Sequence, residues 1–221
     1  MKEALVEKTL KVIDKISKME FVKSYYLVGG TALALQIKHR LSEDLDFMNW
    51  KNFKNDKQDI NIRQIKNELA QSFIIDKVDI LGNNHIEIYI DNNVKLSFYV
   101  PDRIKPVIKP VTYLNNLILA DIDCIAALKM EVLLRRNEFK DYYDLYCILN
   151  DKDLETVIEI ISKAYKYSKH HLKSKNLIGM LTNSERFNKS LDFSELEPKY
   201  QITAKEIEGF MIELMKKLYN K

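Results

Sequence analysis

Two glycines and two carboxylates stand close together near the start of the chain. Gly29 and Gly30 directly follow the apolar run SYYLV, and Asp44 and Asp46 are separated by one residue. Where a strand ends in Gly-Gly at the start of a helix, a phosphate can reach the free N–H groups and the positive end of the helix dipole. Aspartates at alternate positions of a strand point to one face and offer the oxygen ligands that Mg²⁺ prefers. The spacing therefore predicts a site for a metal-bound nucleoside triphosphate.

Three nearby side chains would add contacts to this site. Thr31 and Ser42 carry hydroxyls, and Arg40 carries a cation suited to phosphate. The alternative is that the glycines form only a tight turn and the aspartates are the exposed residues of an edge strand. The whole pattern of apolar strand, Gly-Gly, short helix and Asp-x-Asp favours the functional interpretation, because structural context adds weight to a motif.

A second group of charged residues lies on a helix predicted to begin at residue 121. Lys129 and Arg136 are seven residues apart and would share a helix face, with Arg135 beside them. These cations would grip a phosphate. The alternative is a solvated basic helix end, which the helix dipole favours. Asp141 would then cap the next helix or pair with the cations.

The elements that would position these residues change in kind along the chain. Predicted helices of the first part cover residues 3–19, 31–37 and 61–71. Predicted strands cover residues 24–28, 44–48, 73–81, 85–90 and 94–100. Only helices are predicted after that, over residues 121–136, 139–149, 153–167, 171–182 and 203–219. The change predicts an α/β domain over residues 1–110 and a helical domain over residues 111–221.

Composition limits the class of protein. Hydrophobic residues make up 46% of the 221 residues, which indicates an ordered globular chain. No apolar run approaches the roughly 18 residues of a membrane span, so we expect a cytoplasmic protein without a membrane partner. The net charge of +3 does not mark a nucleic-acid binder. Two basic stretches, 102–110 and 163–175, fit either a phosphate-backbone contact or a solvated lysine-rich surface.

Residues 20–150 resemble a known family. VGGTALAL with HRLSEDLDF, followed later by DIDCIAALKMEVLLRRNEFKDYYDLYCIL, is similar to the AbiEii/AbiGii nucleotidyltransferase toxins, a branch of the polymerase-β-like nucleotidyltransferase superfamily. The resemblance implies an α+β fold, in which a polymerase-β-like mixed sheet with flanking helices is followed by a helical domain that completes the nucleotide site. The motif residues that match the family are Gly29, Gly30, Asp44, Asp46, Lys129, Arg135 with its neighbour Arg136, and Asp141 with Asp144 one helical turn later.

The implied reaction moves a nucleoside monophosphate from an NTP to an acceptor hydroxyl, with Mg²⁺ or Mn²⁺ as cofactor. The resemblance also implies a toxin of a type IV toxin–antitoxin or abortive-infection system, a cognate antitoxin, and a tRNA 3′ end, another RNA or a protein as acceptor. One departure favours an alternative, a catalytically inert nucleotide- or nucleic-acid-binding module. Ser97 stands where the superfamily usually has a third carboxylate, and Glu87 or Asp79 would replace it only if the sheet register placed one beside Asp44.

Overall fold

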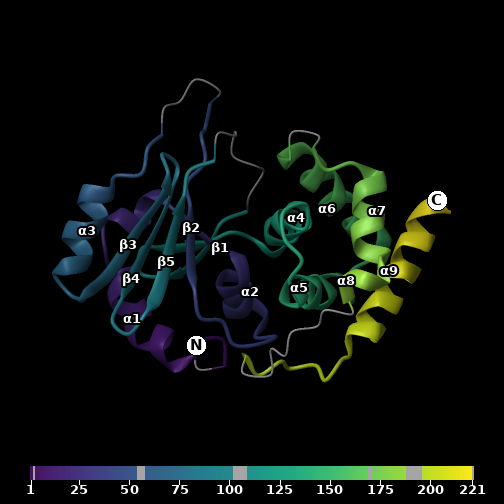
Figure 1. Cartoon of the computed structure of the whole chain (residues 1–221), viewed down its shortest axis with the longest axis horizontal. Coiled ribbons are helices and arrows are strands. Elements are labelled where there is room, and N and C mark those ends of the chain that lie inside the picture. The colour runs from purple at the N-terminus through teal and green to yellow at the C-terminus, as the bar shows by residue number, and fades with distance from the viewer. Residues whose placement is uncertain (2, 54–57, 102–108, 169–170, 188–195, 221) are drawn as a thin grey trace. The chain divides into compact units, whose positions relative to one another are not determined.

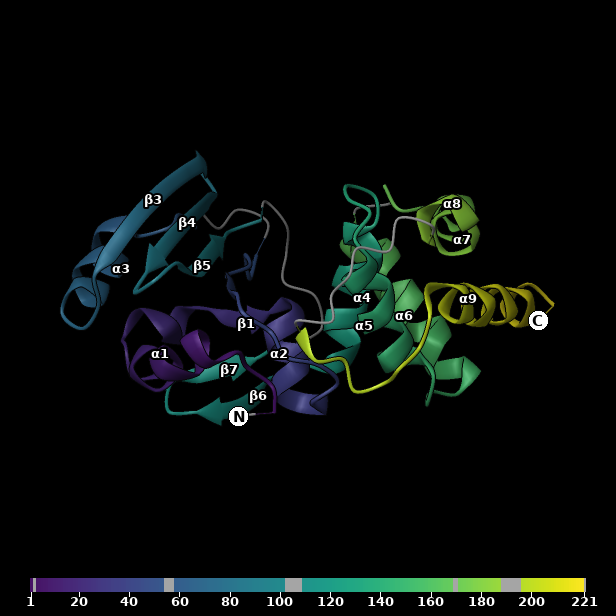
Figure 2. The same cartoon turned by 60° about the horizontal axis from the view of Figure 1, so that its bottom comes forward.

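The computed structural model of the chain describes residues 1, 3–53, 58–101, 109–168, 171–187 and 196–220. The chain divides into two compact units, Met1–Asp121 and Ile122–Lys221. The first unit combines a sheet with helices and the second is helical (Figures 1 and 2). The predicted α+β class is confirmed. The division predicted at residue 110 lies before two short strands that the sequence analysis did not predict, and both belong to the sheet of the first unit.

Within the described residues, seven strands form one mixed sheet in the order β3-β4-β5-β2-β1-β7-β6. Their bounds are β1 Tyr26–Val28, β2 Leu45–Met48, β3 Ile75–Gly82, β4 His85–Ile90, β5 Val94–Tyr99, β6 Val111–Leu114 and β7 Leu117–Leu119. Strand β2 is antiparallel to β1 and parallel to β5, whereas β3, β4 and β5 form the predicted antiparallel ribbon. The strand that carries Asp46 therefore lies at the centre of the sheet.

The sheet has one apolar and one polar face, because side chains alternate along each strand. On the apolar face, Phe47 of β2 stacks on Phe98 of β5 with ring centroids 5.2 Å apart. Edges of Phe21 and Tyr25 pack against the same two rings. The helices of this unit are α1 Glu7–Ser17, the 3₁₀ helix Phe21–Ser24, α2 Gly29–Ile37 and α3 Ile62–Ala70. Figure 1 shows α1 and α3 on one side of the sheet and α2 on the other.

In the second unit, α4 packs against α5 and α6, and α9 packs against α5, α6, α7 and α8 (Figure 2). Its helices are α4 Ile122–Val132, α5 Phe139–Leu149, α6 Leu154–Tyr167, α7 Ser174–Thr182, α8 Ser184–Phe187 and α9 Ala204–Tyr219. Helix α4 ends four residues before the predicted end at residue 136, because the N–H groups of residues 134 and 135 bond three residues back and tighten the last turn. None of the described helices is long and apolar enough to cross a membrane.

Candidate active site

The carboxylate of Asp46 lies directly over the start of α2. Val28, the last residue of β1, is paired with Asp46 of β2. Gly29 follows with φ of 70°, in the left-handed region that favours glycine. A Cβ at Gly29 would stand 2.6 Å from Oδ2 of Asp46, so any side chain there would displace the carboxylate. The glycine thus permits the close approach of this carboxylate to the helix N-terminus.

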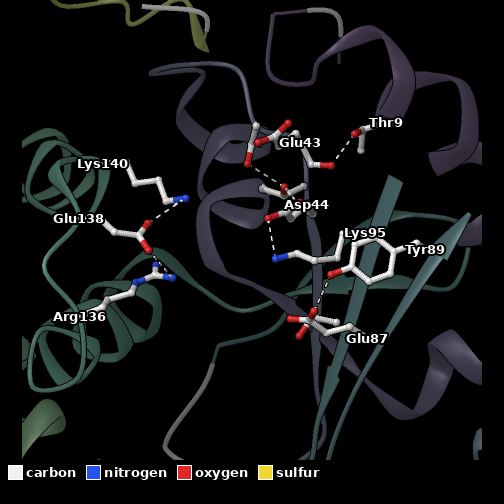
Figure 3. A network of polar contacts seen from close by, with 12 residues as sticks. Thr9, Glu43, Asp44, Glu87, Tyr89, Lys95, Arg136, Glu138 and Lys140 are labelled. Atoms are coloured by element: carbon white, nitrogen blue, oxygen red, sulfur yellow. Dashed lines mark hydrogen bonds and ion pairs between the residues drawn. The ribbon is translucent and has the colours of Figure 1, made fainter. Parts of the chain in front are cut away.

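Asp44 reaches the same region by a different route from the predicted one. The sequence analysis placed it on a strand over residues 44–48, but β2 begins at Leu45 and Asp44 lies just before it. The hydroxyl of Thr31 in α2 donates to the backbone carbonyl oxygen of Asp44. Its carboxylate Oδ2 lies 3.0 Å from Nζ of Lys95 on β5 (Figure 3). Asp44 is therefore held by α2 on its backbone and by β5 on its side chain.

The second glycine lies against a buried cation. Arg40 is only 4% exposed, and a Cβ at Gly30 would stand 2.5 Å from a terminal nitrogen of its guanidinium. Another terminal nitrogen of Arg40 donates to the carbonyl oxygen of Leu41 at 2.8 Å. Thr31 and Ser42 are also buried, with their hydroxyl oxygens 2.9 Å apart. These two hydroxyls fasten the segment before Asp44 to α2, and a direct contact with nucleotide stays a prediction.

A row of polar residues crosses the polar face of the sheet beside Asp46. Asp46 is paired with Ser97 of β5, Ser97 with Glu87 of β4, and Glu87 with Asp79 of β3. Glu87 and Asp79 are therefore two and three strands away from Asp46, and neighbouring strands lie about 4.8 Å apart. Ser97 therefore occupies the position beside Asp46, and the register does not bring either acidic residue next to the Asp44–Asp46 segment. No cluster of three or more metal-binding side chains occurs among the residues that the structure describes.

Glu87 and Asp79 have partners of their own on this face. The hydroxyl of Tyr89 donates to Glu87 at 2.7 Å (Figure 3), and this hydrogen bond is the main cause that raises the pKa of Tyr89. Nζ of Lys77 lies 2.7 Å from Oδ2 of Asp79. Both acidic residues therefore belong to polar contacts away from Asp44.

Lys95 is the charged residue at the site that the sequence analysis missed. Burial alone would lower its pKa, but the charge and hydrogen bond of Asp44, together with the charges of Asp46 and Glu87, outweigh burial and raise it. Lys95 therefore carries a positive charge at neutral pH. The signal available in the sequence was its position two residues before Ser97, which places both side chains on one face of the strand.

In the second unit, Lys129 lies in a buried cluster of charges. Its Nζ is 2.9 Å from Oδ1 of Asp141 and 2.6 Å from Oδ2 of Asp144, and both carboxylates have no exposed surface. Arg136 donates to both oxygens of Asp141, from Nε at 2.8 Å and from a terminal nitrogen at 2.9 Å. Burial would raise the pKa of Asp141, but Lys129 and Arg136 outweigh it and lower the pKa. Two cations thus balance two carboxylates.

The two arginines do not lie as the helix pattern predicted. Both follow the end of α4, so Lys129 and Arg136 do not share a helix face, although they meet at Asp141. Arg135 pairs with Glu131 instead. Glu138 lies 3.6 Å from Arg136 and 2.9 Å from Lys140 (Figure 3). The side chains of both arginines are about half exposed, whereas the side chain of Lys129 is enclosed.

The two basic stretches are described only in part. Residues 102–108 and 169–170 lie outside the described residues. Of the remainder, Lys163 on α6 lies 3.7 Å from Asp123 of α4. Their contact with nucleic acid stays a prediction.

Comparison with solved structures identifies the class of fold. A putative nucleotidyltransferase from H. pylori matches with a TM-score of 0.56 and 20% identity over 98% of each chain. JHP933 from Helicobacter pylori matches with a TM-score of 0.51 and 20% identity over 98% of this chain and 96% of that one. The fold is therefore that of a nucleotidyltransferase.

The family follows from the sequence. The family described as Nucleotidyl transferase AbiEii toxin, Type IV TA system, matches residues 12–217. The chain belongs to this family. The protein aq_aa25 of Aquifex aeolicus (strain VF5) is 26% identical over 203 residues, which cover 90% of this chain and 89% of the relative. The resemblance seen in residues 20–150 is thereby confirmed and extends over nearly the whole chain.

Proposed function

We propose that the protein transfers a nucleoside monophosphate from an NTP to an acceptor hydroxyl, as the toxin of a type IV toxin–antitoxin system. The observation that carries the proposal is the position of the Asp46 carboxylate over Gly29, at the start of α2. Asp44 lies beside it, fastened to the same helix through Thr31. Carboxylates beside a helix N-terminus combine a place for a cation with a place for phosphate. Membership of the AbiEii family supports the same reaction.

The residues present fit a divalent cation. Asp44 and Asp46 offer carboxylate oxygens, and Mg²⁺ commonly binds through one or two carboxylates, with substrate phosphates and water completing its shell. The ion pair between Asp44 and the ammonium of Lys95 supports a place for a cation at this carboxylate. Asp44 and Asp46 would hold Mg²⁺ or Mn²⁺. Such an ion, when bound, neutralises charge on the phosphates and lowers the barrier to their displacement.

The protein groups orient the substrate and stabilise its charge. The first N–H groups of α2 follow Val28, whose side chain cannot cap them. These N–H groups would face the triphosphate. Arg40 lies against Gly30 in the same turn and would add positive charge. In the second unit we assign phosphate contacts to the half-exposed Arg135 and Arg136, with Lys129 and Asp141 holding Arg136 in position. This assignment rests on the family match as well as on exposure.

The reaction proposed is a single displacement. A bond forms between the acceptor oxygen and the α-phosphorus, and the bond from that phosphorus to the bridging oxygen of pyrophosphate breaks. The proton of the acceptor hydroxyl passes to Asp46 and then to water. Catalysis comes from orientation and charge stabilisation, so no covalent protein intermediate is required. The acceptor would be a tRNA 3′ end, another RNA or a protein, and a cognate antitoxin would bind the chain.

One observation favours a second candidate, a binding module without catalytic activity. Ser97, not a carboxylate, stands beside Asp46 in the sheet. A site with fewer carboxylates would bind a nucleotide and fail to accelerate its transfer. The two candidates differ in whether label moves from nucleotide to acceptor.

Label transfer tests the proposal directly. The protein is incubated with each of the four α-³²P-labelled NTPs, Mg²⁺, and total RNA or total protein, and products are separated on denaturing gels. We expect label on an acceptor with the wild type, and a loss of at least about 100-fold with Asp44→Asn or Asp46→Asn, because the charge that holds the cation is removed. Lys77→Met, which removes an exposed lysine from an ion pair on the same sheet, is the matched control and should leave transfer unchanged. Nucleotide binding without transfer would favour the inert module.

A further inference from the structure

An ammonium group stands in the candidate metal site. Lys95 of β5 extends toward Asp44, which lies just before the neighbouring strand β2 (Figure 3), and its Nζ is 3.0 Å from Oδ2 of that carboxylate. The side chains of Lys95 and Asp44 are 28% and 33% exposed, so solvent screens the pair only in part. Lys95 therefore places a positive charge against one of the two carboxylates.

The neighbouring position lacks the charge that a second metal ion would need. Ser97 is paired with Asp46 and lies on the same face of β5 as Lys95. Its hydroxyl is 3.3 Å from Nε2 of His85, which is a contact directed along the sheet toward β4. Ser97 thus offers a neutral group where a carboxylate could bridge two ions.

Charge balance separates one-ion from two-ion occupancy. Two divalent ions about 3.5–4 Å apart bring four positive charges, and sites of this kind use carboxylates that both ions share. Asp44, Asp46 and Lys95 together carry a net charge of −1. That charge suits one divalent ion, whose remaining charge falls on the triphosphate. A second ion would have to bind against the Lys95 ammonium.

We propose that the site holds a single divalent cation and that Lys95 takes the place of the second one. The inference rests on the proposed function and names one feature of that same site. Lys95 is a positioning residue: it holds Asp44 while the site has no metal, and it supplies a fixed positive charge beside the phosphates during transfer. It also competes with the metal for Asp44, so its charge weakens metal binding while supporting the reaction.

Counting Mn²⁺ ions by electron paramagnetic resonance tests the proposal without relying on activity. Free Mn²⁺ is titrated with full-length protein, and ions at the site are taken as the difference from Asp44→Asn/Asp46→Asn, which corrects for other acidic residues. We expect one ion in the wild type. Lys95→Met and Lys95→Gln should each bind one ion about tenfold more tightly, because a cation at ion-pair distance is removed. Lys77→Met is the matched control and should bind like the wild type.

A variant designed to bind a second ion provides a further test of the number of Mn²⁺ ions at the site. Lys95→Met/Ser97→Asp adds a third carboxylate and removes the competing ammonium, so it should bind two ions and show the line broadening of two neighbouring Mn²⁺ ions. At saturating Mn²⁺ the Lys95→Met enzyme should transfer nucleotide more slowly than wild type although it binds metal more tightly. A residue with only a structural role would not move these two quantities in opposite directions.

The outcomes separate the inference from the proposed function. Two ions in the wild type, or an unchanged Mn²⁺ affinity in both Lys95 variants, would overturn the inference and leave the transferase proposal standing. If the wild type, Asp44→Asn/Asp46→Asn and the Lys95 variants all bound the same number of Mn²⁺ ions with the same affinity, the metal site would be wrong. Both proposals would then be overturned. Circular dichroism of each variant identifies any that has lost its fold, and the remaining Lys95 variant then decides.

Discussion

Replacing Lys129 with methionine should destabilise the helical unit far more than the loss of one surface charge would. Lys129 lies within 2.9 Å of Asp141 and 2.6 Å of Asp144, and neither carboxylate is exposed. Methionine has nearly the volume of lysine but no charge. The variant therefore keeps both buried carboxylates and the pairing of Arg136 with Asp141 but loses the charge of Lys129. Removing one partner of a buried ion pair typically costs about 3–5 kcal/mol. The unfolding free energy of Lys129→Met should fall by an amount in that range.

Lys140→Met is the control that separates burial from charge. Lys140 also forms an ion pair, with Glu138 at 2.9 Å, but both side chains are more than one third exposed. Exposed pairs contribute about 0–1 kcal/mol, because solvent screens them and ordering two side chains has an entropic cost. Both variants remove one lysine charge near the start of α5. A difference between them therefore measures burial.

Urea unfolding followed by circular dichroism at 222 nm is the assay, because the second unit is helical. With an m value of about 1–3 kcal/mol/M, the midpoint of Lys129→Met should fall by at least about 1 M. Fluorescence of Trp50, the single tryptophan, reports the first unit in the same samples. An unfolding free energy within about 1 kcal/mol of that of Lys140→Met would refute the argument.

The pH dependence gives a second check on the same cluster. The folded protein holds the pKa of Asp141 below its ordinary value of 3.8. The folded state thus binds its proton less readily than the unfolded chain, so the stabilisation is present above pH 3.8 and is lost as pH falls through the folded pKa. In Lys129→Met the carboxylate pair should take up a proton at higher pH, which relieves an uncompensated buried charge. The stability gap between variant and wild type should therefore narrow on acidification from pH 7 to pH 5.

Three further substitutions test the fold around the site. Gly29→Ala should reduce nucleotide transfer and Mn²⁺ binding together, because its Cβ would stand 2.6 Å from Asp46 Oδ2 at a backbone φ of 70°; unchanged Mn²⁺ binding by paramagnetic resonance would count against it. Phe98→Ala should lower the stability of the first unit by about 3–5 kcal/mol in Trp50 fluorescence, since it removes a fully buried ring stacked on Phe47. Thr203→Ala should lower the stability measured at 222 nm by about 1 kcal/mol, because it removes the N-cap of α9.

Local pattern was sufficient to predict most of the sheet but not its short strands. The predicted strands over residues 85–90 and 94–100 match β4 and β5 closely because strict alternation marks both. Strands β6 and β7 have only four and three residues, and β6 lacks a buried alternate. Their place in the sheet depends on the pairing of β7 with β1, far away in the sequence. The pattern of neighbouring residues alone therefore does not predict that pairing.

The same limit explains which site residues were predicted. The proximity of Asp46 to Gly29 follows from the pairing of β1 with β2, and both strands and the helix that connects them lie within the motif. The contact between Lys95 and Asp44 depends on the parallel pairing of β2 with β5, which lie about fifty residues apart. The position of Ser97 beside Asp46 depends on the same register. Long-range pairing therefore decides how many charges the site contains.

Burial assigns different tasks to the two charged motifs. At Asp44 and Lys95 about one third of each side chain is exposed. Water can therefore solvate the Lys95 ammonium when Asp44 binds another cation in its place. At Lys129 the exposed fraction is 7%, and its two carboxylates have none, so exchanging a partner would leave a buried charge uncompensated. Reversible binding of metal and phosphate is therefore easier at the first motif. The second motif is better suited to holding Arg136 in a fixed orientation, because its lysine is more enclosed than its arginines.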